Sequence, residues 1–186
     1  VEAMGGTIYV ESKPGQGSCF EVLIDLKIAK ERPAFLSSKE EETPNGAILE
    51  GMHFLYAEDN ELNAEILTEL LKMKGAECTI CENGQKVVET FEQSVPGAYD
   101  MILMDVQMPV MNGYDAARAI RRSLHKQAGT IPIIAMTANA FSEDIRHSLT
   151  AGMNAHISKP VDMMLLEKTI RSIKSGGGAE TQADKE

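Results

Sequence analysis

The sequence predicts an α/β domain in which five parallel strands alternate with five helices, forming a doubly wound sheet with the strand order 2-1-3-4-5. Two observations lead to this prediction. Between residues 51 and 175, short apolar runs alternate strictly with amphipathic stretches of helical period. The apolar runs are nearly continuous, which is typical of strands whose two faces are both covered by helices.

Each expected strand is a short apolar run followed by a polar or turn-forming residue. In chain order, the five strands are His53–Ala57, Cys78–Cys81, Met101–Met104, Ile131–Met136 and His156–Ser158. Four of them are followed by, or end at, a side chain that can ionise or donate a hydrogen bond. Because the carboxyl ends of parallel strands meet at one edge of the sheet, these side chains are expected to lie together there.

Five helices are expected between and after the strands. They are residues 61–74, Gly84–Gln93, Ala116–Leu124, Phe141–Thr150 and a last helix that begins after Asp162. Asn60 and Asp162 are suited to cap helix amino termini, and Gly75 and Gly152 are suited to end helices. Apolar residues recur every three or four positions in these stretches, which predicts one buried face for each helix.

The residues before and after this domain have a different composition. Thr7–Val10 and Phe20–Ile24 have strand character and flank a Pro-Gly turn, which predicts a β-hairpin. The glutamates and the Thr-Pro-Asn-Gly that follow predict a solvated linker, and the Gly-Gly-Gly that opens the tail predicts disorder. We therefore expect four segments: the hairpin at 1–28, the linker at 29–50, the α/β domain at 51–175 and a disordered tail at 176–186.

Composition excludes some classes of function. The formal charge is -10 and aromatic residues make up 5% of the chain, which disfavours a nucleic-acid-binding surface. No apolar run approaches the roughly 18 residues that cross a bilayer. Three cysteines do not form a disulfide framework, and their odd number fits a reducing, cytoplasmic compartment. Cys78 and Cys81 form a C-x-x-C pattern, but residues three apart on a strand point to opposite faces and cannot easily chelate one ion.

The residues at the expected sheet edge form a coherent set for phosphoryl chemistry. Glu58 and Asp59 follow the first strand, Asp105 ends the third, Thr137 ends the fourth and Lys159 ends the fifth. Three converging carboxylates repel each other and raise each other's pKa unless a cation is present, and hard oxygen ligands suit Mg²⁺. An ammonium and a hydroxyl beside them can bind the oxygens of a phosphoryl group. One carboxylate is then the nucleophile, and Asp105 is the central candidate because it ends the middle strand.

These residues also carry a family resemblance, in the order Tyr56-Ala57-Glu58-Asp59-Asn60, Met104-Asp105-Val106-Gln107-Met108-Pro109-Val110-Met111-Asn112-Gly113, Met136-Thr137-Ala138 and Lys159-Pro160. The chain resembles the receiver domain of two-component response regulators over roughly residues 51 to 175. The resemblance implies a flavodoxin-like fold in which Asp105 accepts a phosphoryl group from phosphohistidine. It also implies Mg²⁺ bound by Asp59, Asp105 and the backbone carbonyl of Gln107, with Glu58 acting through water. Lys159 and Thr137 would contact the phosphoryl oxygens, and the Lys159-Pro160 bond would be cis.

The resemblance extends to a conformational switch. In the family, the hydroxyl residue moves inward on phosphorylation and a buried aromatic three residues before the lysine follows it. Thr137 is the hydroxyl residue here, but His156 occupies the aromatic position, where Phe or Tyr is commoner. Imidazole is planar and fits the same slot, so both a switch role and a plain structural role stay open for His156. The resemblance also implies a role for Gln107 and Asn139, whose positions in the family flank the attacking water and tune phosphoryl lifetime.

The hairpin segment has a resemblance of its own. Met4 to Ser12 and Pro14 to Phe20 look like the last strands of a histidine-kinase ATPase domain. With a linker and a receiver after it, this implies a hybrid sensor histidine kinase whose ATP-binding and phosphohistidine parts lie outside these residues. By itself the chain would catalyse only its own phosphorylation and dephosphorylation. Its expected partners are the phosphohistidine donor domain of the parent or a partner kinase, and a histidine phosphotransfer protein.

Two other classes of function remain as alternatives. A phosphoaspartate hydrolase of the haloacid-dehalogenase type needs a second acid two residues after the nucleophile, and Gln107 stands there. A pseudo-receiver used only for binding is expected to lack acids or the lysine, and all of them are present. A flavin-binding protein of similar fold is disfavoured because carboxylates, rather than hydroxyls and amides, follow the first strand.

Overall fold

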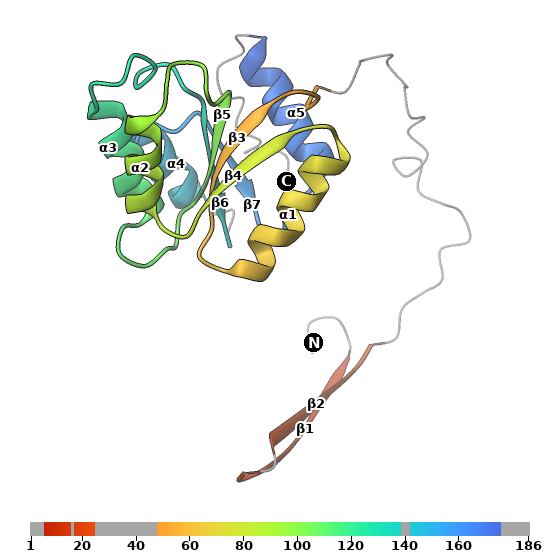
Figure 1. Ribbon diagram of the computed structural model, residues 1–186. Coiled ribbons are helices and arrows are strands. Elements are labelled where there is room, and N and C mark those ends of the chain that lie inside the picture. Colours follow the sequence, from red (N-terminus) through yellow and green to blue (C-terminus); the bar gives the residue numbers. More distant parts are fainter. Residues whose placement is uncertain (1–5, 16, 25–47, 139–141, 176–186) are drawn as a thin grey trace. The chain divides into compact units, whose positions relative to one another are not determined.

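The computed structural model describes residues 6–15, 17–24, 48–138 and 142–175. The chain divides into two compact units, Val1–Pro44 and Asn45–Glu186. In the first unit, strands β1 (Thr7–Lys13) and β2 (Gly17–Leu23) pair antiparallel, with Val10 opposite Phe20 (Figure 1). The predicted hairpin is confirmed, and all of its strand residues are exposed within this unit.

The described residues of the second unit form a five-stranded parallel sheet with five helices. The strands are β3 (His53–Ala57), β4 (Glu77–Cys81), β5 (Met101–Asp105), β6 (Ile133–Thr137) and β7 (Ala155–Ser158). The helices are α1 (Glu61–Met73), α2 (Gly84–Gln93), α3 (Gly113–Arg122), α4 (Ser142–Thr150) and α5 (Met163–Lys174). The strands lie in the order β4-β3-β5-β6-β7 and pair in parallel, which is the predicted 2-1-3-4-5 order.

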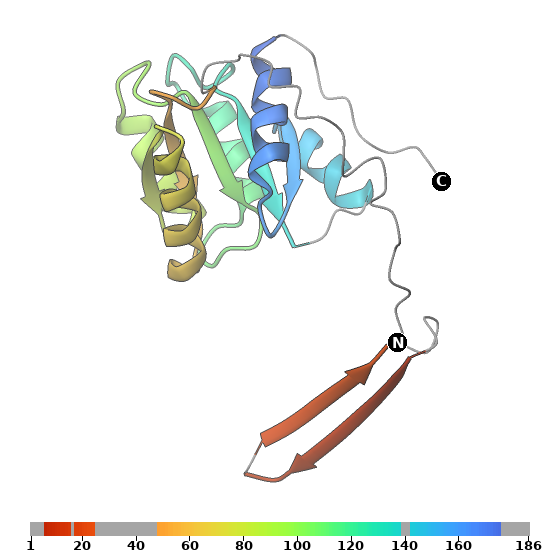
Figure 2. The same cartoon turned by 90° about the vertical axis from the view of Figure 1, so that its right-hand side faces the viewer.

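The helices form two layers, one on each face of the sheet. Helices α2, α3 and α4 cover one face, and α1 and α5 cover the other (Figure 1). Figure 2 shows α1 and α5 side by side, and Lys74 after α1 forms a 3.0 Å ion pair with Glu167 of α5. Each face has its own apolar core, with Leu55 and Ile102 on the α2–α3 side and Tyr56 and Leu103 on the α1–α5 side. Because both faces are covered, the strands β5 and β6 are buried throughout, as the continuous apolar runs predicted.

Cys78 and Cys81 lie on opposite faces of β4. Cys78 packs against the core under α1 and α5, whereas Cys81 belongs to the core under α2 and α3. Both thiols are free, and burial raises the pKa of Cys78 to about 11. The strand geometry that argued against a shared metal ion is therefore confirmed.

Several boundaries differ from the predictions. Helix α3 begins at Gly113 and ends at Arg122, whereas Ala116 to Leu124 was predicted, because the side chain of Asn112 caps it by accepting from the backbone N–H of Asp115 at 2.9 Å. Strand β6 begins at Ile133, after Pro132, rather than at Ile131. Phe141 and Asn139 lie outside the described residues, as do most of the predicted linker and the tail. Among the helices that the structure describes, none has the length and apolarity that a membrane span requires.

Candidate functional site

The polar residues predicted at the sheet edge converge at the carboxyl ends of four neighbouring strands. Glu58 and Asp59 follow β3, and Asp105 is the last residue of β5. One carboxylate oxygen from each of these three residues lies within 4.8 Å of the others. Thr137 ends β6, and its carbonyl oxygen accepts a hydrogen bond from the backbone N–H of Lys159 at 2.7 Å. This backbone hydrogen bond therefore joins the carboxyl ends of β6 and β7 beside the acidic cluster.

Lys159 is the cation at the centre of this cluster. Its Nζ donates to Asp105 Oδ2 at 2.7 Å and to Glu58 Oε2 at 2.5 Å. Both acids are nearly inaccessible, with Glu58 3% and Asp105 5% exposed, whereas Asp59 is exposed. Two buried carboxylates thus share one ammonium, and Asp59 faces solvent.

The protonation of Asp105 reflects competing effects. Burial raises the pKa of Asp105, and the hydrogen bond and charge of Lys159 and the N–H of Gln107 oppose this rise. Repulsion from Glu58 also raises the pKa of Asp105, but it is the smallest of these effects. The repulsion between carboxylates that the sequence predicted is therefore a secondary cause of the raised pKa, after burial. Burial lowers the pKa of Lys159, but hydrogen bonds to Asp105 and Glu58 outweigh it and raise this pKa overall. Lys159 is therefore charged at neutral pH.

Glu58 has two further partners that were not predicted from the sequence. The phenol of Tyr56 donates to Glu58 Oε2 at 3.1 Å, and the Asn63 side-chain amide donates to Glu58 Oε1 at 3.1 Å. Tyr56 lies on β3, two residues before Glu58, which directly follows the strand, and Asn63 lies in the first turn of α1. Burial and the Glu58 charge raise the pKa of Tyr56, so its phenol stays protonated and acts as a donor.

The loop after β5 is held by backbone hydrogen bonds at both of its ends. The N–H of Gln107 donates to Asp105 Oδ1 at 3.1 Å, and the N–H of Gly113 donates to the carbonyl of Val106 at 3.0 Å. Val110 has a φ of 68°, a left-handed conformation that a β-branched residue rarely adopts. The N–H of Met111 donates to the carbonyl of Pro109 at 2.7 Å, so these residues form a γ-turn around Val110. Strain of this kind persists only where the surrounding structure fixes it.

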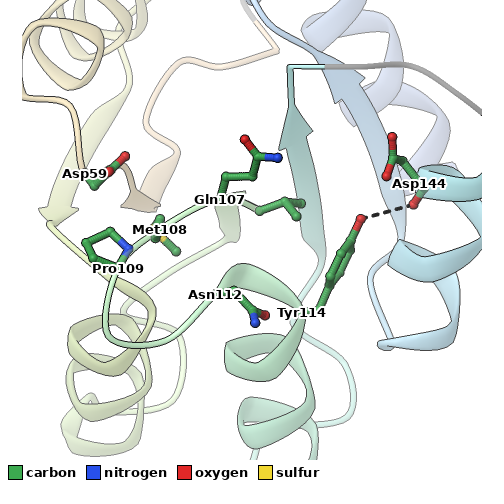
Figure 3. Close-up of a pocket in the computed structure, with 8 residues that line it drawn as sticks. Asp59, Gln107, Met108, Pro109, Asn112, Tyr114 and Asp144 are labelled. Atoms are coloured by element: carbon green, nitrogen blue, oxygen red, sulfur yellow. Dashed lines mark hydrogen bonds between the residues drawn. The ribbon is translucent and has the colours of Figure 1, made fainter.

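A groove of about 570 Å³ opens beside the acidic cluster. Figure 3 shows Asp59 on one side of it, Tyr114 and Asp144 on the other, and Gln107 between them. The Tyr114 phenol reaches the carbonyl oxygen of Asp144 at 3.5 Å, which connects α3 with α4. The exposed carboxylate of Asp59 therefore lines an open groove rather than an enclosed cavity.

His156 on β7 is half buried. Both of its ring nitrogens are buried, and neither has a hydrogen-bond partner among the residues that the structure describes. The Lys159-Pro160 peptide bond, three residues later, is cis as predicted. Thr137 is 5% exposed and lies on the neighbouring strand, where it pairs with Ser158 rather than with His156.

The donor set fits a divalent hard cation. Three carboxylates from two strands present oxygens close enough together to ligate one ion, and Asp59 leaves one side open to water. Such an ion requires oxygen ligands and keeps several waters, which matches a cluster with one exposed acid. Glu58, Asp59 and Asp105 are the residues that can hold it. The backbone carbonyl of Gln107 lies in the same loop, and its predicted role as a ligand stays a prediction.

Comparison with known protein families gives a match over most of the second unit. Residues 54–171 match the response regulator receiver domain. The chain is 32% identical over 185 residues to the aerobic respiration control sensor protein ArcB of Escherichia coli, an alignment that covers 98% of this chain and 22% of ArcB. The chain spans less than a quarter of the length of the curated relatives that it matches.

Solved structures give the same result. The receiver domain of the sensor histidine kinase PA1611 from Pseudomonas aeruginosa, solved with a magnesium ion in its active site cleft, is 36% identical, with a TM-score of 0.59 over 67% of this chain and 98% of that one. A second match is a chain in the co-crystal structure of the Saccharomyces cerevisiae histidine phosphotransfer signaling protein Ypd1 and the receiver domain of Ssk1. It is 30% identical, with a TM-score of 0.60 over 72% of this chain and 95% of that one.

Proposed function

The chain belongs to the response regulator receiver domain family, and from that membership we propose that Asp105 accepts a phosphoryl group in a two-component phosphorelay. The observation that carries this proposal is the ammonium of Lys159 placed between the buried carboxylates of Asp105 and Glu58. A lysine held at the nucleophile by two acids is well placed to bind a phosphoryl oxygen as the group arrives. A binding module without chemistry has no need for this arrangement.

The proposed reaction transfers the group from phosphohistidine to Asp105. A carboxylate oxygen of Asp105 forms a bond to phosphorus while the bond between phosphorus and the imidazole nitrogen breaks, and that nitrogen keeps the electron pair. Lys159 exchanges its contact with Asp105 for a phosphoryl oxygen, and the Thr137 hydroxyl donates to another. Hydrolysis or onward transfer to a second histidine then breaks the acyl phosphate. The fixed N–H of Gln107 keeps Asp105 in position throughout.

We propose Mg²⁺ as the cofactor, held by Glu58, Asp59 and Asp105 with the carbonyl of Gln107. The fit of the three carboxylates supports this, as does the magnesium ion in the related PA1611 receiver. When bound, the ion supplies positive charge that stabilises the transferring phosphoryl oxygens.

Phosphorylation should require Mg²⁺ and should proceed from two kinds of donor. The chain is incubated with acetyl phosphate or with a phosphorylated histidine phosphotransfer protein, with Mg²⁺ or with excess EDTA, and its intact mass is recorded. We expect one phosphoryl group per chain with Mg²⁺ and none with EDTA, and faster labelling from the protein donor than from acetyl phosphate at equal concentration. Absence of labelling from both donors with Mg²⁺ present would favour the pseudo-receiver alternative.

The phosphoaspartate hydrolase alternative receives no support from the geometry. That chemistry needs a second acid in the loop after Asp105, but Val106 is buried and Gln107 is an exposed amide. The pseudo-receiver alternative is disfavoured because none of the five expected residues is missing at the ends of the neighbouring strands: Glu58, Asp59, Asp105, Thr137 and Lys159.

We propose that residues 1–28 are the last strands of a histidine-kinase ATPase domain, joined by a linker at 29–50 to the receiver at 51–175, with 176–186 as a tail. The similarity to ArcB over 98% of the chain supports this arrangement. The exposed apolar side chains of the hairpin, such as Ile8 and Phe20, fit strands that pack in a larger domain. The parent protein would then be a hybrid histidine kinase, with this part in the cytoplasm.

The partner that docks beside the site is proposed to be a phosphohistidine-bearing helical domain. Helix α1 starts two residues after Asp59 and exposes Leu62 and Ile66, four residues apart on one helix face, at 64% and 52%. A donor must approach Asp105 from the open side of the cluster, so this apolar stripe lies where the donor arrives. The Ypd1 complex of the related Ssk1 receiver is consistent with such a partner.

We propose that Thr137 and His156 act together as the conformational switch. Thr137 lies at the site, and His156 lies on the adjacent strand with two buried, unpaired ring nitrogens within the described part of the chain. Because no hydrogen bond from the described residues fixes the His156 ring in its present position, the side chain can move to a second position without breaking one. The ring NMR signals of His156 should shift when Asp105 is phosphorylated, and unchanged signals would leave His156 with a structural role.

Replacing His156 with Phe should remove one source of acid destabilisation. Burial lowers the pKa of His156, and the charge of Asp144 opposes this shift. The imidazole of His156 therefore binds a proton more readily in the unfolded chain than in the folded one. Its contribution to the free energy of unfolding is complete above its ordinary pKa of about 6.5 and is lost as the pH falls toward the lower pKa of the folded chain. Urea midpoints are compared at about pH 7.5 and about pH 5.5.

The difference between the two pH values should be smaller for His156→Phe than for the native chain, because the other titrating groups are common to both proteins. At the higher pH the variant should be more stable by about 1–3 kcal/mol, since two unpaired polar atoms are removed from the interior. Equal pH dependence in the two proteins would show that the ring is solvated in solution.

A further inference from the structure

A buried phenol lies directly behind the acidic cluster. Tyr56 is 1% exposed, and its ring packs in the apolar core under α1 and α5 with Phe54 and Leu67. Its hydroxyl donates to Glu58 Oε2 at 3.1 Å, the same oxygen that accepts from Lys159 Nζ. The ring is thus a core residue, and the hydroxyl is part of the site.

The hydroxyl has no packing role that a Phe ring would fail to supply. A polar atom in an apolar core costs free energy unless it is hydrogen-bonded, and Glu58 supplies that bond. Residues two apart in an extended chain point to the same side, and this places the side chain of Glu58, which directly follows β3, on the side of Tyr56. The presence of the hydroxyl is therefore explained by Glu58 rather than by the core.

Within the described part of the chain, Glu58 accepts three hydrogen bonds, from side chains on β3, on α1 and after β7. Lys159 and Tyr56 share Oε2, and Asn63 Nδ2 donates to Oε1 at 3.1 Å. Of these donors only Lys159 is charged, and it is also bound to Asp105. When Lys159 turns toward a phosphoryl oxygen, Tyr56 and Asn63 are the donors that remain on Glu58.

We propose that Tyr56 is a positioning residue that fixes the orientation of the Glu58 carboxylate toward the metal, so that Glu58 stays in place when Lys159 changes partner. This proposal rests on the proposed function, since it concerns the same metal and phosphoryl site. Asn63 plays the matching role at the other carboxylate oxygen. Second-layer donors of this kind typically affect metal affinity about 10–100-fold.

The test is the variant Tyr56→Phe, with Tyr99→Phe as the matched control. Tyr99 contacts the ring of His53, with 5.3 Å between ring centroids, and takes no part in the site. Titration calorimetry with MgCl₂ alone, without a phosphodonor, should give about tenfold weaker binding for Tyr56→Phe and native affinity for Tyr99→Phe. In labelling with acetyl phosphate, Tyr56→Phe should need more Mg²⁺ for half-maximal rate but should reach the native maximum.

A purely structural role would give a different pattern. If Tyr56 is a positioning residue, thermal unfolding in EDTA should be similar for the native chain and Tyr56→Phe. The tyrosine absorption change caused by Mg²⁺ should then disappear in Tyr56→Phe and persist in Tyr99→Phe. If Tyr56→Phe does not fold, Asn63→Ala on the exposed helix surface decides, with a loss of Mg²⁺ affinity expected. Native Mg²⁺ affinity in the folded variants would overturn the proposal.

The two proposals fail in different ways. Should the native chain bind Mg²⁺ but accept no phosphoryl group, the proposed function fails, and the calorimetric comparison of the variants still decides the role of Tyr56.

Discussion

Asp105→Asn should abolish phosphorylation and leave the fold intact. The amide has the same shape but lacks the negative charge and the nucleophilic oxygen, so no acyl phosphate forms. Its carbonyl oxygen can still accept from Gln107, and Lys159 keeps Glu58 as a partner. Burial already disfavours the charged form of Asp105, so the neutral side chain should change the free energy of unfolding by no more than about 1 kcal/mol. Intact mass after incubation with acetyl phosphate and Mg²⁺ gives the labelling, and urea unfolding gives the stability.

Asp115→Asn is the matched control for this experiment. Asp115 is an exposed acid in the first turn of α3, where it pairs with Arg118 and lies outside the acidic cluster. It should be labelled like the native chain. Labelling of Asp105→Asn at the native rate would assign the nucleophile to another residue, and the mechanism proposed for Lys159 would fail with it.

Gly113→Ala should destabilise the domain and disturb the site at the same time. A Cβ at this position would overlap the carbonyl oxygen of Asp105 and come within 3.0 Å of Met104 Cγ. The first of these atoms is backbone of a central strand, so it cannot move without disturbing the sheet. The cost should be about 3 kcal/mol, at the upper end of the range for overpacked interiors. Urea unfolding measures it, and the labelling rate of the remaining folded protein should also fall, since Asp105 is displaced.

Gly129→Ala is the control for Gly113→Ala. No atom beyond its chain neighbours lies within 4 Å of a Cβ at Gly129. The Gly129→Ala variant should leave the free energy of unfolding within about 0.5 kcal/mol of the native value. If Gly113→Ala proves as stable as Gly129→Ala, the close contact between α3 and the end of β5 does not exist in solution.

The architecture could be predicted because its signals are long and repeated. Strands such as Met101–Asp105 are apolar up to their last residue, and helix starts such as Asn60 and Asp162 carry capping side chains. The beginning of α3 was predicted three residues late because Gly113 disfavours a helix, and the capping role of Asn112 depends on local backbone geometry. The left-handed conformation of Val110 had no sequence signal, since it goes against the preference of a β-branched side chain.

The site was predictable to the extent that its residues stand at strand ends. Five polar residues stand at the ends of apolar runs, so the sheet itself brings them together: Glu58, Asp59, Asp105, Thr137 and Lys159. Tyr56 lies inside such a run, and an apolar pattern does not report where a phenol hydroxyl points. The alternation of strand faces, which pairs Tyr56 with Glu58, was the available signal.

The arrangement around Lys159 implies an order of events. Three carboxylates and one ammonium leave this cluster with two negative charges in excess, at a place where two of the acids are shielded from bulk water. An anionic donor that arrives at this cluster meets net repulsion, whereas a divalent cation cancels the excess completely and a monovalent ion cancels half of it. Metal loading should therefore precede the encounter with the donor, and Na⁺ or K⁺ should not substitute for Mg²⁺.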